Sequence, residues 1–176
     1  MMAYITQVNY EEASQEVKEQ FDYQIKHNGK ITNMKKTLLH SIPAYKALME
    51  WYTLKDVVEP FIGDRGVNFY CYAISTENDC LICSTFFAQI LDELKIDFNS
   101  FSFTEKESTL IAYGRALVSS PHKISEAIFN DLKKFFNEEQ IVALTAFGSI
   151  MIATNLINTA LKVELDVELE PYSKRR

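Results

Sequence analysis

Residues 79–94 read DCLICSTFFAQILDEL, and this stretch decides the fold. Asp79 can accept hydrogen bonds from the free N–H groups at a helix start, so a helix is predicted from Asp79 to about Lys95. This start would put Cys80 in the first turn and Cys83 at its end. A pocket beside them would be apolar and aromatic, although a place in the core explains Phe86 and Phe87 equally well.

On both sides of this stretch, apolar residues also recur at the spacing of a helix. Apolar residues from Tyr10 to Ile25 recur at helical spacing, and Asn28-Gly29 is a typical helix stop. Helices are predicted over 10–28, 31–41, 44–58, 64–76, 79–95, 104–118, 124–136 and 140–161. The one strand-like alternation runs from Val163 to Leu169 and could be an edge strand or an extended tail. The pattern predicts an all-α fold in a single domain spanning residues 1–176.

The composition is that of a compact globular protein. Of 176 residues, 47% are hydrophobic and 24% charged, with five Gly and four Pro, which excludes disordered and collagen-like chains. The net charge of -6 repels phosphate backbones, and the short basic cluster from Lys174 to Arg176 does not reverse this, so no nucleic-acid partner is predicted. Residues 1–16 lack a basic segment followed by an apolar one. The expected location is therefore cytoplasmic.

Residues 140–161 carry no charged side chain, and their length is sufficient to cross a bilayer. Polar residues, among them Thr145, Ser149 and Thr154, interrupt the apolar character along the whole segment, and no Lys or Arg asymmetry flanks it. We therefore predict a buried core helix here and no membrane association.

Three cysteines, Cys71, Cys80 and Cys83, carry the candidate chemistry. A structural disulfide framework is not expected in a cytoplasmic protein of this size. A zinc site needs about four ligands, and one of three distant histidines would have to complete the set. We therefore predict no metal site and no cofactor.

The spacing of Cys80 and Cys83 suits reversible oxidation. A Cys-x-x-Cys at a helix start puts two sulfurs one turn apart on one face, where they can close into a disulfide. The helix dipole and the unpaired N–H groups favour a thiolate there, whereas the negative charges of Glu77 and Asp79 oppose it. The alternative is that both are small core side chains, the role we expect for Cys71.

The segment from Asp64 to Leu94 resembles the carboxymuconolactone decarboxylase and alkylhydroperoxidase AhpD-like family, in its peroxidase-related branch. The resemblance continues in FTEKESTLIAYGRAL (residues 103–117) and in 143–165, where Asn155 and Asn158 lie three positions apart. It covers residues 60–166. It implies an AhpD-like helical bundle, a redox Cys-x-x-Cys and homo-oligomers. From the residues alone, the two asparagines are more often capping or interface residues than ligand-binding ones.

The resemblance also implies that Cys83 attacks the substrate and that Cys80 resolves the intermediate. The family's most active peroxidases have a Glu twelve residues before the first cysteine and a His four residues after the second, which form a proton relay. This sequence has Asn68 and Phe87 there, and neither transfers a proton at neutral pH. General acid–base help contributes about 10²- to 10⁴-fold, so we expect weak peroxidase activity at most.

Two classes of function remain. The leading hypothesis is a thiol-disulfide oxidoreductase that reduces small hydroperoxides or exchanges electrons with a thiol/disulfide partner, in which Glu77, Tyr70 or Tyr72 could replace the relay. The alternative is a non-redox, homo-oligomeric binding or interaction protein on the same scaffold. Lactone decarboxylation, the reaction in the family's name, ranks last because no acid or base for it is identifiable.

Overall fold

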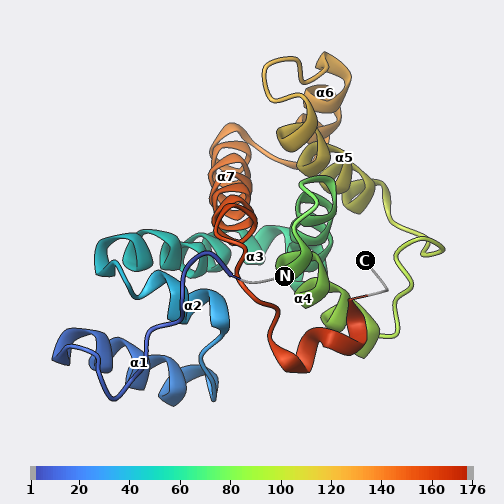
Figure 1. The fold of residues 1–176 in the computed structure, drawn as a ribbon. Coiled ribbons are helices and arrows are strands. Elements are labelled where there is room, and N and C mark those ends of the chain that lie inside the picture. The colour runs from blue at the N-terminus through green and yellow to red at the C-terminus, as the bar shows by residue number, and fades with distance from the viewer. Residues whose placement is uncertain (1–2, 174–176) are drawn as a thin grey trace.

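The computed structural model describes residues 3–173, and the basic cluster at 174–176 lies outside them. Within the described residues the chain forms helices and no strands, so the predicted all-α class is confirmed. The elements are α1 (Gln15–Asn28), α2 (Asn33–Leu38), α3 (Ile42–Glu77), α4 (Leu81–Glu93), α5 (Glu105–Ser119), α6 (Glu126–Phe135), α7 (Glu138–Ala160) and the 3-10 helix η1 (Val167–Tyr172). Figure 1 shows α7 beside α3 in the middle, with α1 and α2 on one side and α5 and α6 on the other.

Several helix ends follow local sequence signals. The Glu107 N–H donates to Thr104 Oγ1 at 3.2 Å and the Thr104 N–H donates to Glu107 Oε2 at 2.9 Å, which makes the start of α5 a capping box. Asn137 and Gln140 form the same reciprocal pair at the start of α7. α1 ends at Gly29, whose φ of 71° is a conformation that glycine adopts readily.

The helices predicted over 44–58 and 64–76 are both present as two helical segments of α3 that meet at a kink. Pro43 lies in its first turn, where the missing N–H needs no partner, so the helix begins earlier than predicted. Pro60 lies inside the helix, and the break falls at Gly63, whose φ of 76° and ψ of 160° are not helical. The chain therefore bends at Gly63 instead of stopping before Pro60, and the part of α3 beyond the bend is largely buried.

The edge strand considered for 163–169 does not form, because a strand needs a neighbour for its backbone hydrogen bonds and the described residues include none. Residues 163–166 have no regular secondary structure, as the alternative of an extended tail expected, and Val163 and Leu165 pack against the main core. The chain then enters η1, which packs against α4, with Leu169 buried and Val167 exposed.

The main core lies where α3 meets α5 and α7. The Tyr70 hydroxyl, on a fully buried side chain, donates to Leu144 O at 2.9 Å. The Tyr70 and Phe147 rings stack with centroids 6.2 Å apart. Gly148 makes room for this contact, because a Cβ there would lie 2.5 Å from Tyr70 Oη. This packing fixes α7 against the half of α3 that leads into the cysteine loop.

A smaller cluster joins α1, α2 and the beginning of α3. Its buried members are Phe21, Leu38, Leu39 and Tyr45. Ile157 of α7 also packs against it. Because α7 contacts both clusters, it connects the N-terminal helices with the rest of the fold.

Among the described residues, α7 is the one helix long and apolar enough to span a membrane, judged by length and composition alone. Leu144, Phe147 and Met151 on this helix lie in the main protein core. The polar Asn155 and Asn158 are also buried inside the protein. These side chains place one face of α7 in the core, whereas Val142 and Leu156 on the same helix are exposed, so the prediction of a buried helix over 140–161 holds for one face only.

Candidate functional site

The loop between α3 and α4 positions the two cysteines. Cys80 is itself the N-cap residue of α4, so the predicted cap at Asp79 lies one residue too early. Asp79 has a φ of 47°, a left-handed conformation that Asp adopts more readily than most residues. The Cys80 N–H donates to Ser75 O at 3.0 Å, and Cys80 O accepts from Ser84 Oγ at 2.7 Å. These bonds tie the cysteine backbone to the ends of both helices.

Cys80 and Cys83 are free thiols within the first turn of α4. The neighbouring Cys83 thiol is the main reason that the pKa of Cys80 falls to about 7, against the opposing effect of burial. The N–H groups of Cys83 and Ile82 at the helix start also favour the charged sulfur. The Cys80 thiol, together with burial, raises the pKa of Cys83. The two shifts run in opposite directions, so a thiolate is favoured at Cys80 over Cys83.

Two residues of α7 contact the sulfurs. Asn158 Nδ2 donates to Cys83 Sγ at 3.2 Å, which favours a thiolate at Cys83. The Thr159 side chain forms a hydrogen bond with Cys80 and helps to lower its pKa. The sequence offered one signal for these contacts, the polar residues within an uncharged helix, but no signal for which sulfur each would reach.

Asn155 lies one turn before Asn158 and joins the same site through Ser75. Ser75 Oγ donates to Asn155 Oδ1 at 3.4 Å, and Ser75 is also the residue whose carbonyl holds the Cys80 N–H. Asn155 Nδ2 and Asn158 Oδ1 are buried without a hydrogen-bond partner. A buried polar atom without a partner costs about 1–3 kcal/mol, so two of them side by side on one helix face need an explanation. Asn155 bonds across to α3 and Asn158 across to α4, so both are interface residues, one of the two roles expected of them, and Asn158 also contacts the dithiol.

Both sulfurs are covered by protein. Cys80 is 1% exposed and Cys83 is 5% exposed. Thr159, whose side chain helps to lower the pKa of Cys80, is exposed. On the side of Cys83, Asn158 Nδ2 also lies 3.4 Å from Met34 Sδ, and Met34 is half-buried. Both sulfurs therefore lie beneath the protein surface.

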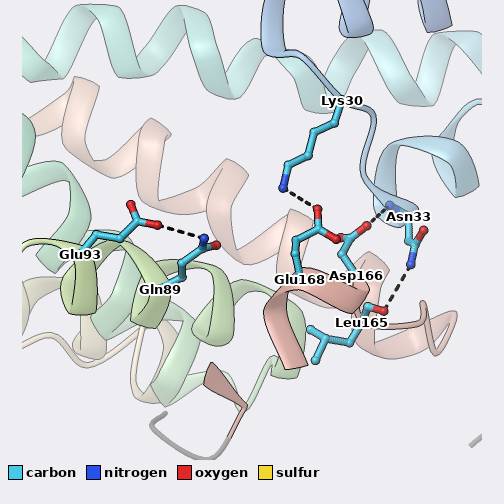
Figure 2. Close-up of polar contacts among 7 residues, drawn as sticks. All are labelled: Lys30, Asn33, Gln89, Glu93, Leu165, Asp166 and Glu168. Carbon is cyan, nitrogen blue, oxygen red and sulfur yellow. Dashed lines mark hydrogen bonds and ion pairs between the residues drawn. The ribbon is translucent and has the colours of Figure 1, made fainter. Parts of the chain in front are cut away.

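The segments before and after the site are joined to each other, as Figure 2 shows. The Asn33 N–H donates to Asp166 Oδ1 at 2.8 Å, and Asn33 Nδ2 donates to Leu165 O at 3.3 Å. Lys30 and Glu168 form an ion pair of 2.5 Å. Asp166 is buried, and this burial raises its pKa. We call these contacts the terminal junction.

The terminal junction holds two chain segments next to Asn158. Met34 directly follows Asn33 of the junction and contacts the Asn158 amide. The Val163 N–H, just before the other half of the junction, donates to Asn158 O at 3.0 Å. The position of Asn158 is thus supported both by α2 and by the segment after α7.

The two positions where the family relay would lie hold no proton carrier. Asn68 is buried, and its Nδ2 lies 3.3 Å from Asp64 Oδ2, to which it donates. Phe87 is buried in the main core, with its ring centroid 5.2 Å from that of Phe86. Neither side chain supplies acid–base chemistry.

The three substitutes considered from the sequence are placed as follows. The Tyr70 hydroxyl is committed to Leu144 O in the core, and burial raises its pKa. Tyr72 packs edge-on against Phe98 at 4.8 Å, and burial raises its pKa as well. Glu77 is exposed at the end of α3. The side chains that shift the pKa values of the two sulfurs are instead the other thiol, Asn158 and Thr159.

The remaining candidate ligands lie apart from the pair. Cys71 is fully buried in the main core, and burial raises its pKa. His27 contacts Tyr23 O and His40 contacts Thr6 O, both on the N-terminal side of the fold. Over residues 3–173, no three His, Cys, Asp or Glu side chains are grouped so that they could hold a metal ion.

No protein-family model matches the chain, and no curated protein matches it by sequence. Solved structures do match. The AhpD core of an uncharacterized peroxidase-related protein from Ralstonia eutropha JMP134 superposes with a TM-score of 0.74 at 16% identity, over 96% of this chain and 95% of that chain. An uncharacterized peroxidase-related protein from Silicibacter sp. TM1040 gives 0.73 at 14% identity, over 93% of each chain.

A third match is the debrominase Bmp8, with a TM-score of 0.79 at 16% identity over 97% of this chain and 96% of that chain. The chain therefore has the AhpD-like all-helical fold over nearly its whole length, as the resemblance implied. At 14–16% identity this likeness shows the fold alone. The chemistry depends on the residues of the site.

Proposed function

We propose that this protein is a thiol-disulfide oxidoreductase that reduces small hydroperoxides through Cys80 and Cys83. The arrangement that carries this proposal is the pair of free thiols at the start of α4, with Asn158 Nδ2 donating to Cys83 Sγ at 3.2 Å. In this pair the pKa of Cys80 is lowered to about 7 and that of Cys83 is raised. A thiolate beside a protonated thiol is what peroxide reduction requires. The peroxidase-related structures of the same fold are consistent with this general kind of chemistry.

In the first step, the Cys80 thiolate attacks the terminal oxygen of the hydroperoxide. The O–O bond breaks, Cys80 becomes a sulfenic acid, and the departing alkoxide takes the proton of the Cys83 thiol and leaves as an alcohol. In the second step, the Cys83 thiolate attacks the Cys80 sulfur. A disulfide forms, hydroxide leaves, and a solvent proton converts it to water. A dithiol partner then reduces the disulfide by thiol exchange.

These roles reverse the ones implied by the family resemblance, which has Cys83 attacking and Cys80 resolving. The thiolate is favoured at Cys80 because this residue lies at the start of α4, next to free backbone N–H groups. Cys83 then supplies the proton that the absent relay would otherwise provide. Because a thiol of raised pKa is a slow proton donor, we expect weak turnover.

A non-redox, homo-oligomeric binding protein is the second candidate, and the burial of both sulfurs favours it. α7 also presents Val142 and Leu156 to solvent, 68% and 63% exposed, on a helix without charged residues from 140 onward. A second copy of the chain would cover these side chains. We propose homo-oligomer formation under either function, a cytoplasmic location, and neither nucleic acid nor membrane as a partner.

Peroxide turnover with cysteine variants separates the two candidates. The protein would be supplied with hydrogen peroxide and dithiothreitol, and peroxide consumption would be followed. We expect slow turnover that is lost in Cys80→Ser and in Cys83→Ser and is unchanged in the matched control Cys71→Ser. Equal consumption by all four proteins, with the oligomeric mass also unchanged, would favour the binding protein.

A further inference from the structure

Asn155 and Asn158 leave one amide atom each without a partner, beside the dithiol. They lie one turn apart on α7, so their side chains share a face. Asn155 is 1% exposed and Asn158 is 2% exposed. Buried side-chain amides normally use both ends in hydrogen bonds.

The hydrogen bonds of the two amide groups show which amide atom of each has no partner. Ser75 Oγ donates to Asn155 Oδ1, so the free end of Asn155 is the donor Nδ2. Asn158 Nδ2 faces the sulfurs of Cys83 and Met34, so its free end is the acceptor Oδ1. The site therefore combines one free donor and one free acceptor next to a reactive sulfur.

This combination selects a particular chemical class. A neutral hydroxyl group both donates and accepts a hydrogen bond, so it can satisfy the two free atoms at once. A carboxylate or another oxyanion only accepts and would leave Asn158 Oδ1 unpaired. An apolar group would leave both atoms unpaired.

We propose that Asn155 and Asn158 bind the terminal –OOH group of a neutral hydroperoxide and position it for attack by the dithiol. The hydroperoxide O–H donates to Asn158 Oδ1 and its oxygen accepts from Asn155 Nδ2. This inference rests on the proposed function and names its substrate class. It also explains how a site without a family-type relay orients its substrate, since Asn158 already touches Cys83.

The test compares two reactions of the same thiols in the Asn155→Leu variant. One is oxidation by hydrogen peroxide or tert-butyl hydroperoxide. The other is modification by methyl methanethiosulfonate, a small thiolate reagent without a hydrogen-bond donor. The loss of free thiols at Cys80 and Cys83 would be followed by mass spectrometry for the wild type, the variant and the control Ser149→Ala, which changes an exposed residue of the same helix.

We expect Asn155→Leu to slow oxidation by both hydroperoxides about 3- to 10-fold, the effect of one lost hydrogen bond. The thiosulfonate reaction should change less than the hydroperoxide reaction, and Ser149→Ala should match the wild type. Asn155→Ser, a smaller polar replacement, provides the same comparison if the Leu variant folds poorly. Equal effects on both reactions, or none, would overturn the inference. Failure of the wild type to be oxidised by either hydroperoxide would instead overturn the proposed function.

Discussion

Asn158 Nδ2 donates a hydrogen bond to Cys83 Sγ at 3.2 Å, which joins the end of α7 to the first turn of α4. The contact links residues 75 positions apart in the sequence. It places an amide donor, which cannot release a proton near neutral pH, on the sulfur whose pKa is raised by the neighbouring thiol and by burial. Asn158 therefore supplies Cys83 with a hydrogen bond but not with a proton.

The pH dependence of Cys80 reactivity follows from this arrangement. Because the pKa of Cys80 is lowered to about 7, its thiolate fraction, and so its rate of alkylation by iodoacetamide, should rise with a midpoint near pH 7. The bond from Cys83 is the main cause, so Cys83→Ala should move the midpoint upward. A wild-type midpoint at the ordinary thiol value of about 8.5, or no change in the variant, would contradict the assignment of the thiolate to Cys80.

Replacing Asn158 by Leu should prolong the life of the sulfenic acid at Cys80. The bond from Asn158 favours the Cys83 thiolate, so its loss raises the pKa of Cys83 and slows the resolving step. After one dose of peroxide in the presence of dimedone, the ratio of Cys80 adduct to Cys80–Cys83 disulfide should be about 3- to 10-fold higher than in the wild type, whatever the rate of the first step. Ser149→Ala serves as the control. An unchanged ratio would mean that Asn158 does not assist resolution.

The pair of cysteines could be predicted from the sequence, but the groups around it could not. Spacing and helix-start signals are local, so Cys80 and Cys83 and the approximate start of α4 were identified. The cap was misplaced by one residue, because Asp79 takes a left-handed conformation that its residue type permits but does not require. The contact with Asn158 depends on how α7 packs against α3 and α4, and no local pattern encodes that.

Packing also decided where the predicted elements differ from the structure. The alternation over 163–169 is a local strand signal, yet without a neighbouring strand residues 163–166 are irregular and lead into η1, which packs against α4. Pro60 is a local stop signal, yet the first helical segment of α3 continues past it to the kink at Gly63. The start of α5 agrees with the prediction because its capping box depends on residues within four positions, whereas α7 begins two residues before the predicted 140.

Gly148 tests the packing that brings α7 to the site. A Cβ at this position would lie 2.5 Å from Tyr70 Oη and 2.7 Å from Leu117 Cδ1, so Gly148→Ala forces the buried Tyr70 ring to move. We expect the free energy of unfolding to fall by about 1–3 kcal/mol in urea denaturation. The adjacent exposed substitution Ser149→Ala should change it by less than about 0.5 kcal/mol. A Gly148→Ala protein as stable as the wild type would show that α7 tolerates a different packing.

The most direct test of the central claim, that Cys80 and Cys83 form a redox pair, is peptide mass mapping after one equivalent of hydrogen peroxide at pH 7. The account predicts a loss of two hydrogens, located in a disulfide between Cys80 and Cys83, with Cys71 still reduced. Thiols that remain reduced, or oxygen added to one cysteine with no disulfide formed, would contradict it.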